Sequence, residues 1–79
     1  MFNTWIDTFV EEKGLFLEEE FEVQGPSGFN IMSYGVIVEV MKSCPPHEQQ
    51  NLKNKIVEID FKNGDIKDFF RYLGEKIAK

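Results

Sequence analysis

Residues 20–32 read EFEVQGPSGFNIM, and this stretch decides the fold class of the chain. Residues 20–23 alternate polar and apolar side chains, which is the period of a half-buried strand. The sequence GPSG at 25–28 is dense in turn-forming residues, so 29–32 can return as a second strand. A two-stranded hairpin alone is only marginally stable in water. We therefore expect helices to pack against it.

An amphipathic helix over residues 5–13 is predicted before the hairpin. Its apolar residues recur at the spacing of one helical face: Phe2, Trp5, Ile6, Phe9 and Val10. Asn3 or Thr4 can cap its start, because their side-chain oxygens accept hydrogen bonds from free amides. Gly14 can end it in a left-handed conformation without a steric penalty.

A second amphipathic helix is predicted near the end of the chain, with Asp65 as its cap. Its apolar stripe is Ile66, Phe69, Phe70, Leu73 and Ile77. Trp5 is the only tryptophan and lies on the stripe of the first helix. We expect it either to pack against Phe69 or Phe70, or to stand exposed as a binding anchor.

Two segments between these helices suit helix and strand alike. Residues 33–43 are rich in β-branched residues, which favours a strand. However, Ser33 is a good N-cap. An apolar stripe of Tyr34, Ile37, Val38 and Met41 follows it at helical spacing, so we favour a helix. The next helix begins near Pro46 and ends at Lys62-Asn63-Gly64, with Gly64 as its cap glycine. Its second half, 56–61, suits a strand equally well.

These elements predict a mainly α (α+β) fold, with about four short helices and a small β-hairpin between the first and second helix. The 79 residues are 42% hydrophobic and 14% aromatic, enough for one compact domain spanning residues 1–79. A single cysteine excludes an internal disulfide. No apolar run is long enough to cross a bilayer, and no basic leader is present, so we expect a cytoplasmic protein.

The charge distribution is more informative than the net charge of −5. Residues 1–40 hold eight acids against Lys13 alone, whereas residues 41–79 hold six acids and eight bases. Six of the acids lie within 12 residues: Glu11, Glu12, Glu18, Glu19, Glu20 and Glu22. This block repels phosphate and anionic lipid and suits a basic partner surface. The alternative is a solvated face that only keeps the protein soluble.

Catalytic and metal-binding chemistry finds little support in the sequence. Cys44 and His47 lack a third group to complete a catalytic arrangement, and as zinc ligands they are two where a structural site takes four. The GPSG loop lacks the lysine of a phosphate-binding loop. We therefore expect no enzymatic activity, no metal and no cofactor.

A small DNA-binding regulator is a third possibility. It would use a basic, amide-rich region made of Asn51, Lys53, Asn54, Lys55, Lys62 and Lys67. Acids interleaved among these residues argue against it: Glu48, Glu58, Asp60, Asp65 and Asp68.

The stretches FEVQGPSG at 21–28 and IDFKNGD at 59–65, together with the helix at 5–13, resemble a group of small uncharacterised proteins carried on phages and mobile elements. This resemblance implies an accessory protein that acts by binding, for example as an inhibitor of a host or defence protein.

The leading hypothesis is a non-enzymatic protein that presents the acidic block to a basic partner. Exposed ion pairs are individually weak, so an aromatic anchor, Phe16 or Phe29, is expected beside the charges. The alternative is a homo-oligomeric scaffolding module. It would use apolar surface left uncovered in two runs, Leu15 to Leu17 and Phe29 to Met32 with Tyr34. The alternative for these runs is that they simply belong to the core.

Overall fold

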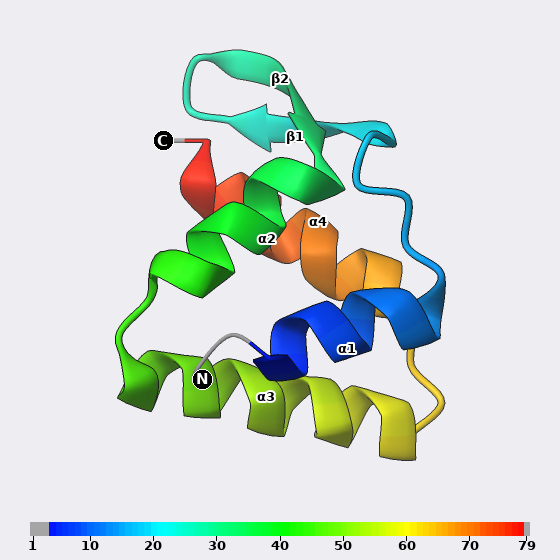
Figure 1. The fold of residues 1–79 in the computed structure, drawn as a ribbon. Helices are drawn as coiled ribbons and strands as arrows, with labels where there is room; N and C mark the ends of the chain where they lie inside the picture. The colour runs from blue at the N-terminus through cyan, green and yellow to red at the C-terminus, as the bar shows by residue number, and fades with distance from the viewer. Residues whose placement is uncertain (1–3, 79) are drawn as a thin grey trace.

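The computed structural model describes residues 4–78, which form four helices and one antiparallel hairpin (Figure 1). In chain order they are α1 (Thr4–Lys13), β1 (Glu20–Gly25), β2 (Gly28–Ser33), α2 (Tyr34–Ser43), α3 (Pro46–Phe61) and α4 (Ile66–Ile77). The hairpin lies between the first and second helix, as predicted. Phe2 of the predicted stripe and Asn3, one of the two predicted caps, lie outside the described residues.

Both ambiguous segments are helical. The hydroxyl oxygen of Ser33 accepts a hydrogen bond from the amide of Val36 at 3.3 Å, which caps α2 as predicted. All four residues of the predicted stripe in α2 are buried, whereas the β-branched Val36 and Val40 point outward. Residues 56–61 continue α3, which carries proline in its first turn. Burial of the stripe therefore outweighs the strand propensity of the β-branched residues.

Glycine serves different purposes at the ends of α1 and α3. Gly14 has a φ of +62°, and the amide of Leu15 bonds back to the carbonyl of Val10, so Gly14 ends α1 as predicted. At the end of α3 the prediction was wrong, because Asn63, with a φ of +56°, takes the left-handed position. Gly64 is needed for space instead, since a Cβ there would lie 2.9 Å from Cγ2 of Ile59.

The core is centred on Phe70 of α4, whose side chain is fully buried. Its ring lies 6.2 Å from that of Phe9 in α1 and 5.4 Å from that of Tyr34 in α2, measured between centroids. The hairpin closes the core from the side of α4, where β1 packs on that helix. Three separate elements therefore meet at one aromatic side chain.

Trp5 packs against the buried core and is hydrogen-bonded to α3. Its side chain is half-buried, and its indole Nε1 donates to the side-chain oxygen of Gln49 at 3.4 Å. The side-chain amide of Gln49 donates to the carbonyls of Lys42 and Cys44. The buried Gln49 thus links α1 to the junction of α2 and α3, which explains why Trp5 faces this side.

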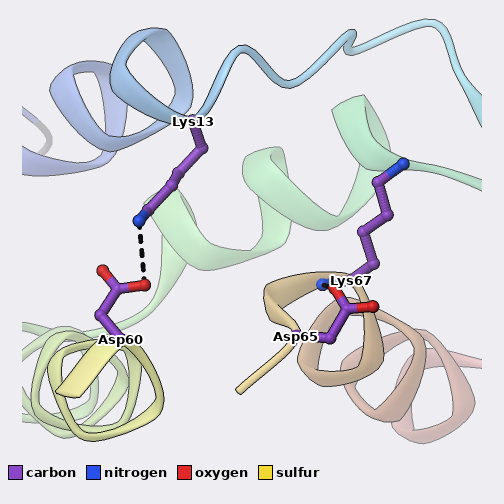
Figure 2. Close-up of polar contacts among 4 residues, drawn as sticks. All are labelled: Lys13, Asp60, Asp65 and Lys67. Carbon is purple, nitrogen blue, oxygen red and sulfur yellow. Dashed lines mark hydrogen bonds and ion pairs between the residues drawn. The ribbon is translucent and has the colours of Figure 1, made fainter. Parts of the chain in front are cut away.

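Polar contacts join the helices at their edges (Figure 2). Nζ of Lys13 lies 2.9 Å from the carboxylate of Asp60, linking the end of α1 to α3. Nζ of Lys42 lies 2.7 Å from the carboxylate of Asp7 and links α2 to α1; this hydrogen bond raises the pKa of Lys42. Asp65 caps α4 as predicted, accepting from the amide of Lys67 at 2.9 Å.

Candidate protein-interaction surface

The hairpin has two faces of opposite character, and its register assigns each residue to one of them. Residues directly opposite each other in antiparallel strands share a face. Phe21 pairs with Met32 and Val23 pairs with Asn30, and these residues form the inner face toward α4. The alternate residues form what we call the outer hairpin face: Glu20, Glu22, Gln24, Phe29 and Ile31.

The outer hairpin face places apolar side chains beside acids. Phe29 is 73% exposed and lies opposite Gln24, and Ile31 is 61% exposed and lies opposite Glu22. Large apolar side chains at this exposure contribute almost nothing to the core. The aromatic anchor that the sequence predicted at Phe29 is therefore available to a partner.

The predicted anchor Phe16 is also exposed, at 76%, in the connection between α1 and β1. Backbone hydrogen bonds hold this connection in place: the amide of Glu19 donates to the carbonyl of Phe16, and the amide of Gly35 donates to the carbonyl of Leu17 at 2.8 Å. Phe16 thus projects from a segment that is fixed to the start of α2.

The two surplus apolar runs are divided between core and surface. Leu15 is half-buried, and Met32 and Tyr34 are buried. The uncovered remainder is Phe16, Leu17, Phe29 and Ile31.

The six acids of the block are all exposed, but the structure spreads them over three segments: α1, the connection that follows it, and β1. Glu11 and Glu12 lie at the end of α1, and the following segment climbs to the hairpin, where Glu20 and Glu22 lie on β1 (Figure 1). Glu12 borders a cleft between α1 and α3. The predicted block is therefore a strip along the chain and not one cluster.

Most of this acidic strip has no internal counter-charge. Only Glu19 forms an ion pair within residues 4–78, with Nζ of Lys67 at 4.0 Å. Its other members have no ion-pair partner in that part of the chain: Glu11, Glu12, Glu18, Glu20 and Glu22. Their charge is available to another molecule.

Ile31 and Phe61 are among the exposed apolar residues that the sequence analysis did not name individually as binding residues. Ile31 follows Phe29 at a spacing of two, so strand alternation alone puts both on the same face. Phe61, at 87% exposed, ends α3 and lies off the helical stripe of Leu52, Ile56 and Ile59. Its position off this stripe could have predicted from the sequence that Phe61 is exposed.

The basic region considered for DNA is largely engaged within the protein. Lys62 and Lys55 both pair with Glu58, and the hydrogen bond from Lys62, followed by the charge of Lys55, lowers the pKa of that carboxyl. Lys67 pairs with Glu19, as described above. Few of these cations remain to meet phosphates.

Cys44 and His47 lie at the junction of α2 and α3. Sγ of Cys44 donates to the carbonyl of Val40 at 3.3 Å, and His47 is exposed. Burial, followed by a hydrogen bond with Glu48, raises the pKa of the Cys44 thiol, which disfavours the nucleophilic thiolate. Cys44 lines an open cleft of about 370 Å³ between α3 and α4.

Within the described residues, no group of three or more His, Cys, Asp or Glu is placed to hold a metal ion.

No helix among residues 4–78 is both long enough and apolar enough to cross a membrane. Comparison of the chain with family models, with curated proteins and with solved structures finds no match.

Proposed function

We propose that this protein is a non-enzymatic binding protein whose outer hairpin face and acidic strip dock on a basic surface of another protein. One observation carries the proposal: Phe29 and Ile31 stand exposed on the same face as Glu20 and Glu22, which form no ion pair with any residue between 4 and 78. An apolar centre bordered by charged residues is the usual anatomy of a protein interface.

The two kinds of residue contribute in different ways. An exposed ion pair is worth about 0–1 kcal/mol, so the glutamates mainly orient the partner and speed its approach. A buried aromatic anchor can contribute about 2 kcal/mol or more once the partner excludes water from it. Phe29 supplies that anchor on the hairpin, and Phe16 supplies a second one beside Glu18.

The biological setting that we propose is inhibition of a host or defence protein, as the resemblance to phage accessory proteins implies. If the target binds nucleic acid, the acidic strip acts as a mimic of the phosphate backbone. Competition between this protein and DNA for the captured target separates mimicry from docking elsewhere on the target.

A pull-down with charge-reversal variants tests the proposal. The test variant is Glu20→Lys with Glu22→Lys, and its matched control is Glu39→Lys with Glu75→Lys, which makes the same charge change at two exposed positions outside the strip. We expect the test variant to lose the partner and the control to retain it. Equal recovery by both variants, with unchanged melting temperatures, would show that the glutamates only confer solubility.

A further inference from the structure

The free edge of β2 is a second surface feature, separate from the acidic strip. In the described part of the chain the sheet has two strands, and β1 is the strand that packs on α4. Strand β2 lies outermost, with no element beyond it (Figure 1). Proteins usually protect such an edge with charged residues, proline or a bulge. The sequence of β2, GFNIMS, contains no charged residue and no proline.

The backbone direction shows which groups of β2 are free. The amide of Tyr34 donates to the carbonyl of Glu19, so residues 19 and 34 form a hydrogen-bonded pair at the open end of the hairpin. Such pairs alternate along an antiparallel ladder, so the next ones are 21 with 32 and 23 with 30. The amides and carbonyls of the intervening residues Phe29 and Ile31, and the amide of Ser33, therefore point to the free edge, whereas the carbonyl of Ser33 belongs to the N-cap of α2.

We propose that β2 pairs antiparallel with β2 of a second copy of this chain, around a two-fold axis at Ile31. The result is a four-stranded sheet in which the two β2 strands are central and the two β1 strands are outermost. The side chains of Ile31 from both copies then become neighbours on the outer face. The two Ile31 residues exchange both of their backbone hydrogen bonds. The amide of Ser33 donates to the carbonyl of Phe29 of the second copy, because residues 29 and 33 lie opposite each other in this register.

Charge favours a second copy over an extended basic peptide as the occupant of this edge. A peptide on β2 would lie two strand spacings, about 10 Å, from the glutamates of β1, so its positive charges would gain little. In the symmetric sheet the two acidic strands lie three spacings apart, about 14 Å, which exceeds the screening length of about 8 Å in physiological salt. The edges that meet are both uncharged, so the net charge of −5 on each copy does not prevent pairing.

This inference does not rest on the proposed partner binding. Strand pairing alone covers a small area, in the class below about 1,200 Å² that is typical of weak and transient complexes. We therefore expect dissociation in the micromolar range. Dimerisation would also widen the outer hairpin face, by joining two apolar centres between two acidic strands.

Sedimentation of the full chain between low-micromolar and submillimolar concentration tests the inference. The apparent mass of the wild type is expected to double across this range. Ile31→Lys should remain a monomer throughout, because it places like charges together at the two-fold axis. The matched control is Val57→Lys, at a residue that is 59% exposed on α3, and it should dimerise like the wild type.

Amide hydrogen exchange locates the contact. The amides of Ile31 and Ser33 should exchange more slowly at high protein concentration than at low concentration, while melting temperatures show that both variants are folded. A wild type that stays monomeric would overturn the inference, even if β2 then bound an added extended peptide. Dimerisation of Ile31→Lys, or protection confined to α3, would overturn it equally.

Discussion

The inner and outer faces of the hairpin share one backbone and differ in what covers them. On the inner face Val23 is 3% exposed and packs on Gly74 of α4. On the outer face Phe29, in the paired strand, is 73% exposed. Period-two alternation builds both faces, but only one is used to stabilise the protein. The difference separates residues that hold the fold from residues that are free to bind.

Removing the aromatic centre beneath the inner face should have the largest effect. Phe70→Ala deletes a fully buried ring that contacts α1 and α2, and the expected loss is about 3–5 kcal/mol of unfolding free energy. Small domains have only about 5–15 kcal/mol in total. Urea denaturation followed by circular dichroism measures the loss. A cost below about 1 kcal/mol would show that Phe70 is not the centre of the core.

Filling the contact between the inner face and α4 should have the next largest effect. A Cβ at Gly74 would lie 2.9 Å from Cγ1 of Val23, so Gly74→Ala is expected to destabilise the fold by about 1–3 kcal/mol. In the double variant, Val23→Ala removes the clashing methyl. The cost of both changes together should then be smaller than the sum of the single costs, by about 0.5 kcal/mol or more. Additive costs would mean that the two residues do not touch.

A smaller effect is expected from the ionisation of Tyr34, which packs against Phe21 of β1 with ring centroids 5.0 Å apart. Burial, followed by the charge of Glu19, raises the pKa of Tyr34 above its ordinary value, while Lys67 and Arg71 oppose this. The unfolded chain therefore loses the proton first, near pH 10, so stability falls as the pH rises above that value. Tyr34→Phe should flatten this alkaline decline when melting temperatures are compared between pH 8 and pH 11. An equal decline in both proteins would refute the assignment.

The smallest stability effect is expected on the outer face. Phe29→Ala and Glu22→Ala should each change the unfolding free energy by no more than about 0.5 kcal/mol, since neither side chain has covered surface to lose. Thermal melts of both variants check this directly. A loss of unfolding free energy comparable with that of Gly74→Ala would show that the outer face also stabilises the fold, so that the two faces would not differ in the way described.

The spacing of apolar residues and the capping residues were sufficient to predict most of the helices and the hairpin. For α2, the apolar stripe and the cap at Ser33 correctly predicted a helix, because burial of a complete stripe outweighs β propensity. The ends of the helices were less predictable. Asn63 and Gly64 both tolerate a left-handed turn, and only the packing of Gly64 on Ile59 decides between them.

The partners of a helical face were harder to predict than the face itself. Periodicity placed Trp5 on the buried side of α1, but it contains no information on which helix covers that side. The position of Gln49 at the start of α3 decides it, through the hydrogen bond to the indole. The surplus of apolar residues indicated the run from Phe29 to Met32 but not which of its residues are exposed; the hairpin register assigns Phe29 and Ile31 to the outer face.

The most direct test of the central claim is the affinity of the captured partner for two charge-matched variants, measured by titration calorimetry. The claim predicts that Glu20→Lys with Glu22→Lys weakens binding at least about tenfold, or 1.4 kcal/mol, at an unchanged melting temperature. Glu39→Lys with Glu75→Lys should bind like the wild type. If both variants bound equally weakly, the change in net charge would explain the effect and the positions of Glu20 and Glu22 would not matter. Unchanged binding by both variants would contradict a binding role for the outer hairpin face.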